Sequence, residues 1–126
     1  MKLRNLFILG AVVALVYAVA ALLVPVKLLT TYGISAGPGE QLMTRFFGGA
    51  LGGLGLILWL AKDVADAAAQ RAITLAFFVF SVVGLVVSLQ GTLGGAMSGA
   101  GWSAVAINGF FTLAWGYSRF GKPKAA

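Results

Sequence analysis

Four long apolar stretches constrain this chain more than any other feature of its sequence. A bilayer core of about 30 Å needs roughly 20 mainly apolar residues in each helix that crosses it. The stretches that reach or approach this length are residues 5–26, 46–61, 72–90 and 103–120. Because they take up most of the 126 residues, we predict an all-α fold: one transmembrane domain, residues 1–126, built as an antiparallel bundle of four transmembrane helices.

The amino-acid composition supports this prediction and narrows the function. Hydrophobic residues make up 60% of the chain and charged residues 10%, whereas soluble domains average about 45–50% and about 25%. The chain has no cysteine and no histidine, which removes disulfides, thiolate metal sites and the side chain most used for proton transfer. We therefore expect a membrane protein that is not an enzyme, with no catalytic residue, no metal and no cofactor.

The nine lysine and arginine residues lie at the predicted helix ends, so the net charge of +6 indicates membrane topology rather than nucleic-acid binding. Basic residues concentrate in cytoplasmic loops. One side of the predicted bundle carries seven of them and the other carries two: Lys2, Arg4, Lys62, Arg71, Arg119, Lys122 and Lys124 against Lys27 and Arg45. This distribution predicts a multi-pass protein of the prokaryotic plasma (inner) membrane with both termini in the cytoplasm.

The first apolar stretch allows a second interpretation as a signal peptide. It has a basic start, and Ala18-Val19-Ala20 fits the small-residue cleavage site of such peptides. Cleavage there would leave three helices in the same orientation. The apolar run continues to Val26, however, beyond the usual signal core of about 7–15 residues. We expect the first helix to be retained.

The segment "RFFGGALGGLGLILWLAKD", residues 45–63, is rich in glycine. It matches neither the phosphate-binding P-loop nor the dinucleotide fingerprint, because no lysine or hydroxyl follows the glycines and no strand precedes them. On a helix, three glycines share one face and two form a neighbouring small-xxx-small pair: Gly48, Gly52 and Gly55, with Gly49 and Gly53 beside them. Glycine allows helix backbones to approach closely in lipid, so these positions predict helix packing.

The predicted third helix, residues 72–90, presents Ser81, Gly84 and Ser88 on one face, which we expect to pack against other helices. Asp66 precedes this helix and is predicted to be its N-cap. The connection that follows, "GTLGGAMSGAGW", has five glycines and no charge. The sequence leaves open whether this segment is a mobile outer loop or dips back toward the membrane.

Two stretches carry a resemblance to a known kind of protein: "TRFFGGALGGLGLILWLA", residues 44–61, and "SLQGTLGGAMSGAGWSAVAINGFFTLAWGYSRF", residues 88–120. An arginine before a glycine-rich helix that ends in Trp-Leu-Ala, followed by a glycine loop that ends in Gly101-Trp102, resembles small four-helix integral membrane proteins of bacteria classed as domains of unknown function. The resemblance covers about the last two thirds of the chain. It implies the fold and no activity.

Placing a polar side chain in the membrane costs free energy, so each polar residue there is a candidate for a functional role. The predicted topology brings several of them to the outer half of the bundle, where they could form a pocket for a lipid headgroup or a small anionic solute: Arg45, Glu40, Gln90, Asn108 and Tyr17. A purely structural interpretation is also open. In it, Arg45 anchors the interface and pairs with Glu40, Gln90 and Asn108 fix helix register, and Tyr17 packs.

Three classes of function then compete. Glycine-lined helices without reactive groups favour an accessory, assembly or stabilising component, with partners in the lipid bilayer, in other membrane subunits or in a second copy of the chain. The second class is a carrier or binder of a lipid or of a hydrophobic or anionic solute. The third, an enzyme acting on lipids, is the least favoured, because Tyr17, Ser81 or Ser88 would have to act without an evident partner.

Overall fold

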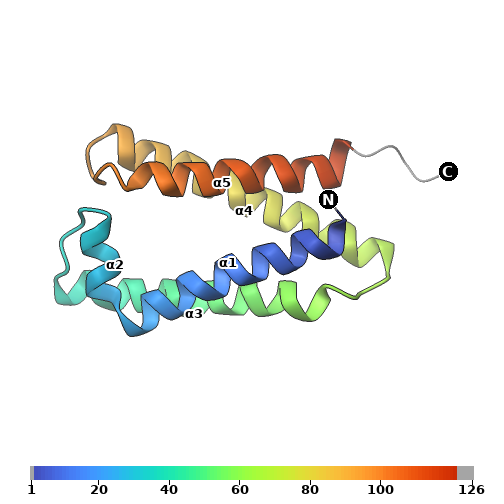
Figure 1. Cartoon of the computed structure of the whole chain (residues 1–126), viewed down its shortest axis with the longest axis horizontal. Coiled ribbons are helices and arrows are strands. Elements are labelled where there is room, and N and C mark those ends of the chain that lie inside the picture. Colours follow the sequence, from blue (N-terminus) through green and yellow to red (C-terminus); the bar gives the residue numbers. More distant parts are fainter. Residues whose placement is uncertain (1, 122–126) are drawn as a thin grey trace. The chain divides into compact units, whose positions relative to one another are not determined.

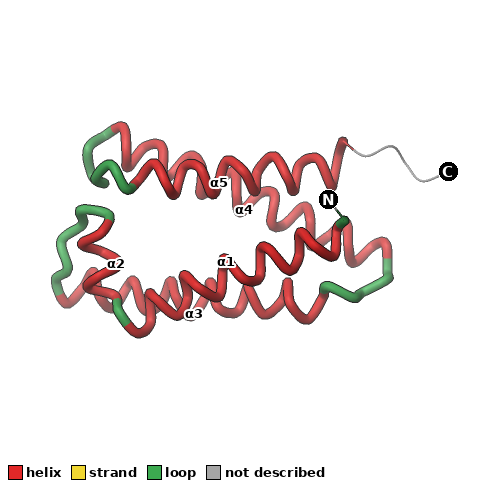
Figure 2. Tube along the Cα trace, viewed as in Figure 1, coloured by secondary structure: helices red, strands yellow, loops and turns green. Residues whose placement is uncertain are grey.

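The structure is a computed structural model that describes residues 2–121 and consists of helices and short loops in that range. The α-helices are α1 (Leu3–Leu23), α2 (Pro25–Thr31), α3 (Pro38–Ala61), α4 (Ala67–Leu93) and α5 (Gly101–Gly116), labelled in Figure 1. A π-helical turn, η1 (Tyr117–Gly121), follows α5 directly. Figure 2 shows the helices joined by short loops. The prediction of an all-α fold is confirmed.

Three of these helices are long enough and apolar enough to cross a membrane: α1, α3 and α4. This is the pattern of a multi-pass membrane protein, and it supports association with a lipid bilayer. The fifth helix, α5, has 16 residues, fewer than the roughly 20 that a full crossing needs. The predicted fourth span therefore includes α5 together with η1, which continues it to Gly121.

Proline places two helix boundaries differently from the prediction. The first stretch was expected to remain helical to Val26, but α1 ends at Leu23, and Pro25 occupies the first turn of a new helix, α2. Proline lacks an N–H group and disfavours a helical residue before it, so it ends one helix and is well suited to begin the next. The intervening Val24 accordingly has a non-helical backbone, with φ −133° and ψ 56°.

The same preference moves the start of the second span. The second apolar stretch was expected to begin at residue 46, but α3 begins at Pro38 with Gly37 as its N-cap. The N–H of Gln41 donates to the carbonyl of Gly37 at 2.9 Å, which closes the first turn. Glu40 and Arg45 therefore lie on α3 itself and not in the loop before it.

The start of α4 confirms the prediction for Asp66. Its carboxylate accepts a hydrogen bond from the N–H of Ala69 at 2.8 Å, so it caps one of the free amides of the first turn. The helix runs from Ala67 to Leu93, several residues beyond the predicted 72–90 at both ends. Its other end is closed by the N–H of Gly94, which donates to the carbonyl of Gln90 at 2.9 Å.

The helices group into two units, each described here by itself. The first contains residues 1–63 with residues 96–100, and the second contains residues 64–95 with residues 101–126. In the first unit α1 packs along α3 in the antiparallel sense, with α2 at one end (Figure 1). In the second, α4 and α5 form an antiparallel pair.

Glycine sets the distance between α1 and α3. A Cβ atom added to Gly48 would lie 2.9 Å from the Cβ of Ala21 and 3.1 Å from the carbonyl oxygen of Ala18, and one added to Gly55 would lie 2.9 Å from Leu15. Both glycines are buried. The facing stretch of α1 is made largely of alanine, so two small surfaces meet and the backbones approach closely.

In the second unit, aromatic rings and a glycine notch join α4 to α5. The rings of Phe77 and Trp115 lie 5.6 Å apart between their centroids, and both side chains are buried. Farther along, the carboxamide of Asn108 occupies the space that the missing side chain of Gly84 leaves. A short residue on α4 therefore accommodates a polar residue on α5.

We predict that Gly48→Ala destabilises the α1–α3 pair by about 1–3 kcal/mol, because the added methyl group meets backbone and Cβ atoms that cannot move independently. Reversible unfolding in mixed detergent micelles measures this. Gly52→Ala is the matched control, since its Cβ would lie at an ordinary 3.5 Å from Ala18. The control should be neutral or stabilising, because alanine favours helix; equal losses in both variants would contradict the packing described here.

Candidate functional site

The five residues of the predicted polar pocket divide between the two units. Tyr17, Glu40 and Arg45 belong to the first unit, and Gln90 and Asn108 belong to the second. Within each unit the structure shows what each side chain contacts. The pocket that would combine all five remains a prediction.

In the first unit, Tyr17 is half-buried on α1, and its hydroxyl lies 3.3 Å from the hydroxyl of Tyr32. Glu40 and Arg45 are both exposed on α3, and no ion pair joins them. The carboxylate of Glu40 folds back toward the N-cap, where a Cβ at Gly37 would meet its Oε1 at 2.7 Å. A negative charge in the first turn interacts favourably with the helix dipole.

In the second unit, Gln90 is exposed near the end of α4. Asn108 is half-buried, and its Nδ2 donates to the carbonyl of Ala104, one turn earlier on α5, at 2.9 Å. Its Oδ1 lies against Gly84, in the notch described above. The Asn108 amide thus contacts both helices of the pair, a position suited to setting their register.

The serines of the predicted packing face lie where α4 is covered. Ser81 and Ser88 are buried, and Gly84 between them is half-buried. The Ser88 hydroxyl donates to the carbonyl of Gly84 at 2.7 Å, so it is satisfied by its own helix. No general base is bonded to this hydroxyl, and the arrangement is that of a packing residue.

The connection between α4 and α5 is fixed to the end of α2 through Ser98. Its N–H donates to the carbonyl of Tyr32 at 2.8 Å, and its hydroxyl donates to the carbonyl of Thr31 at 3.1 Å. Gly33, at φ +72°, allows this approach, because a Cβ there would lie 2.9 Å from that of Ser98. No local sequence pattern indicates this contact, which joins residues 67 positions apart.

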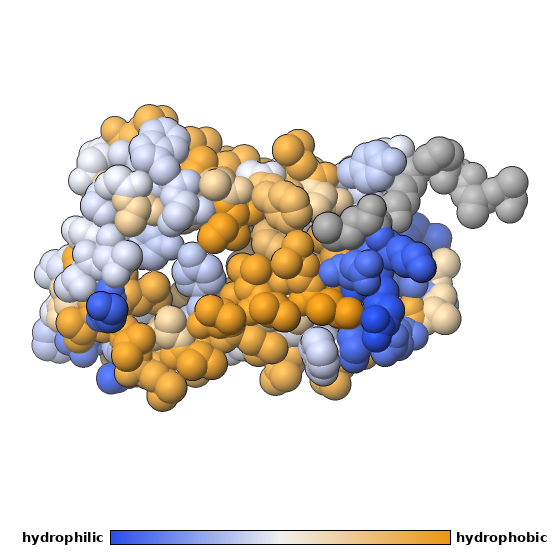
Figure 3. Space-filling view, in the orientation of Figure 1, coloured by the Kyte–Doolittle hydropathy of each residue, from blue (hydrophilic) through white to orange (hydrophobic). Residues whose placement is uncertain are grey.

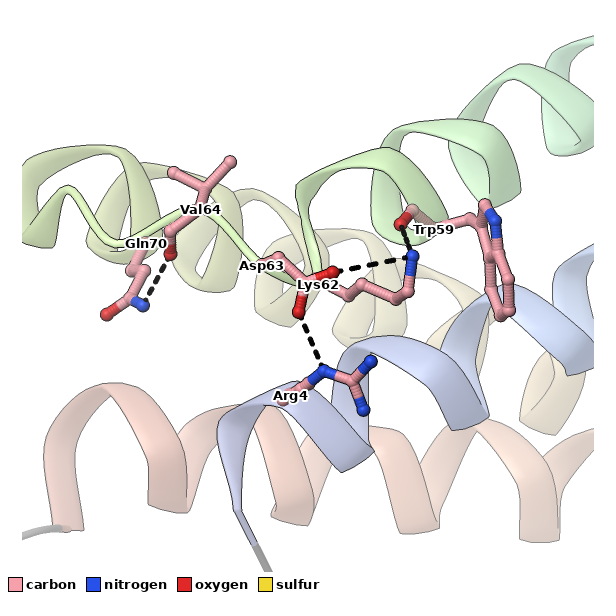
Figure 4. A network of polar contacts seen from close by, with 6 residues as sticks. All are labelled: Arg4, Trp59, Lys62, Asp63, Val64 and Gln70. Atoms are coloured by element: carbon pink, nitrogen blue, oxygen red, sulfur yellow. Dashed lines mark hydrogen bonds and ion pairs between the residues drawn. The ribbon is translucent and has the colours of Figure 1, made fainter.

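A charged network lies where α1 begins and α3 ends (Figure 4). The Nε of Arg4 donates to Oδ1 of Asp63 at 2.7 Å, and the Nζ of Lys62 lies 3.7 Å from Oδ2. Lys62 also donates to the carbonyl of Trp59 at 3.2 Å and lies 4.2 Å from the centre of its indole ring. Sequence reasoning placed Arg4 and Lys62 on one side of the membrane but did not foresee that one carboxylate joins them.

The electrostatics of this network act most clearly on Asp63. The hydrogen bond from Arg4 holds the pKa of this carboxyl below its usual value of 3.8, and the charges of Arg4 and Lys62 act in the same direction. The Asp63 side chain is 63% exposed, so water and salt weaken the pair and its contribution to stability is small. The network is more important for the placement of its cations than for the stability of the fold.

No family model, curated protein or solved structure matches the chain. The resemblance to small bacterial four-helix membrane proteins therefore remains a prediction from the sequence. The function has to be argued from the geometry of the two units.

We predict that Gly84→Ala disrupts the α4–α5 pair, because the new Cβ would overlap the Asn108 carboxamide. The displaced amide would lose its place between the helices, at a cost of about 1–3 kcal/mol in the free energy of unfolding. Gly109→Ala is the control, since its Cβ would meet only Leu85, at 3.9 Å. The double variant Gly84→Ala, Asn108→Ala should recover part of the loss; no recovery would contradict this account.

The Asp63 ion pair predicts a defined pH response. Because the folded pKa is lowered, the stabilising contribution is complete above about pH 4 and is lost as the pH falls through the lowered value. Carboxyl NMR of the protein in micelles should place the Asp63 midpoint below 3.8, and Arg4→Gln should raise it toward 3.8. Lys27→Gln should leave it unchanged. A midpoint that does not respond to Arg4→Gln would show that the ion pair is not formed.

Proposed function

We propose that this chain is a non-catalytic component of the prokaryotic inner membrane that assembles with another transmembrane helix, from a second copy or another subunit, through an open face of α3. The observation that carries the proposal is that Gly49 and Gly53 have open space around them. A Cβ atom added to either would meet nothing within 4 Å, and both residues are exposed. The glycines of α3 thus divide into a face that α1 covers and a face that the first unit leaves uncovered.

The open face has the residue pattern of a helix-docking surface. Gly49 and Gly53 lie one turn apart, and exposed large side chains continue the same side of α3 toward both ends: Phe46, Leu56 and Ile57. Small residues flanked by bulky ones form a groove that a second helix can enter, and in lipid such close approach is a main source of helix association. A glycine within a helix costs about 0.5–1 kcal/mol relative to alanine, so two without a partner in this unit favour a partner elsewhere.

The four-helix topology is part of the same proposal. Helix α5 and the turn η1 form an uninterrupted helical run from Gly101 to Gly121, about the length of a membrane crossing. With α1, α3 and α4 it would complete an antiparallel four-span bundle with both termini in the cytoplasm. The gathering of Arg4 and Lys62 at one end of α1 and α3 supports this orientation. Lys122 and Lys124, which contribute to the same charge bias, lie outside the described residues.

The carrier hypothesis has less support from the geometry. Two of its five residues already have partners in their own unit, since Tyr17 bonds to Tyr32 and Asn108 bonds to Ala104. A ligand in the pocket would have to replace these hydrogen bonds, whereas assembly through α3 breaks none of them. It requires only a partner surface that fits the groove.

We predict that Gly53→Leu weakens this assembly at least tenfold while the chain still folds, because leucine fills the groove without touching α1. Native mass spectrometry of the protein released from its own membrane in native nanodiscs measures the complex. Ala76→Leu is the control, since it adds the same bulk to an exposed position of α4. A complex that survives Gly53→Leu and Gly49→Leu unchanged would refute assembly through this face.

A further inference from the structure

The end of the first unit where α1 begins carries more positive charge than its internal ion pairs neutralise. We define the Arg4 cluster as Lys2, Arg4, Lys62 and Asp63. Asp63 is its single anion, so three cations and one anion leave a net charge of +2. Figure 3 shows strongly hydrophilic residues gathered at this end, beside the hydrophobic surface along α1.

The Arg4 guanidinium group has hydrogen-bond donors that the ion pair with Asp63 does not use. Only its Nε bonds to Asp63, and its two terminal nitrogens lie on the far side of the guanidinium group (Figure 4). Within residues 2–121 these nitrogens have no hydrogen-bond acceptor, and the side chain is 53% exposed. A guanidinium group held at Nε presents its remaining nitrogens as a planar fork, the geometry that binds two oxygens of one phosphate.

Lys62 is held in place, which is unusual for a lysine at a helix end. Its side chain is only 18% exposed, whereas lysine is mostly solvated. The Trp59 carbonyl, the Trp59 ring and the Asp63 carboxylate together fix its ammonium group. Asp63 therefore contacts both cations, and it keeps two positive groups from different helices near each other.

We propose that the Arg4 cluster binds the phosphate of an anionic phospholipid headgroup. The phosphate would sit on the terminal nitrogens of Arg4, with Lys62 and Lys2 supplying further positive charge. The position selects a lipid over a soluble phosphate. Arg4 is in the first turn of one candidate span, and Lys62 directly follows another, so both lie at the level where headgroups meet water.

The neighbouring apolar surface fits the rest of a lipid molecule. Trp59 and Leu60 are exposed on the last turn of α3, directly beside the cluster in sequence. Tryptophan favours the membrane interface, and the exposed leucine next to it in the chain can contact an acyl chain. A phosphate above and a hydrocarbon chain below would engage both kinds of surface at once. A free phosphate would use only the first.

Native mass spectrometry of the full-length protein with phosphatidylglycerol and phosphatidylcholine of equal chain length tests the proposal. Each basic residue near an anionic membrane surface strengthens binding by about fivefold. We expect the double variant Arg4→Gln, Lys62→Gln to retain phosphatidylglycerol about twenty-five-fold less than the unmodified protein. The double variant Lys27→Gln, Arg71→Gln removes the same charge from exposed positions outside the cluster and should retain it normally.

One conservative substitution distinguishes a phosphate site that needs the guanidinium group from a nonspecific attraction between positive charge and anionic lipid. Arg4→Lys keeps the charge and loses the fork, so phosphatidylglycerol retention should fall severalfold. It also tests the site if the double variant does not fold, which circular dichroism would reveal. Equal loss in the two double variants, or full retention by Arg4→Lys, would overturn the proposal.

Two further arms identify the source of the phosphate and separate this site from the assembly face. Glycerol phosphate in large excess should not displace the lipid; displacement would show that a soluble phosphate is enough and would overturn the choice of a lipid. Gly53→Leu should retain phosphatidylglycerol as the unmodified protein does. Loss of lipid in that variant would tie the binding to assembly and contradict an independent site at the Arg4 cluster.

Discussion

The close approach of α1 and α3 is the contact on which the first unit depends. In a bilayer, apolar side chains gain little by leaving lipid for one another, so helix pairs are held by tight packing and by the few polar contacts that they can make. The alanine-rich side of α1 and the buried glycines Gly48 and Gly55 supply that packing. Because these helices run antiparallel, their pairing also brings Arg4 to Asp63. The ion pair thus follows from the packing and does not create it.

The same helix carries two kinds of glycine, and this division gives α3 its place in the proposed function. Neighbouring residues on a helix point about 100° apart, so Gly48 and Gly49 serve different surfaces although they are adjacent in the chain. One surface packs inside the unit, and the other is the surface that we propose for a partner helix. The Arg4 cluster lies at the end of the same helix pair, so assembly and lipid binding would act on one unit without sharing residues.

The sequence was sufficient for features that depend on local pattern. Apolar length indicated α1, α3 and α4, and an aspartate before a helical stretch indicated the Asp66 cap. It failed at the helix boundaries that prolines set: the first stretch was expected to continue to Val26, so α2 was missed, and α3 begins at Pro38 and not at residue 46. It also could not show which glycines α1 covers, since that depends on the rotation of α3. The Arg4–Asp63 pair, 59 residues apart, has no local signature.

Ser98 gives the first unit an unusual dependence on the order of synthesis. Its hydrogen bonds to Thr31 and Tyr32 close the α2 end of that unit, yet Ser98 follows all of α4 in the chain. A protein made from its N-terminus can therefore pair α1 with α3 early. The carbonyls of Thr31 and Tyr32 gain their hydrogen bonds from Ser98 only after more than thirty residues beyond α3 have been added. Until Ser98 has been made, the first unit can hold paired helices but lacks the two hydrogen bonds that close its α2 end.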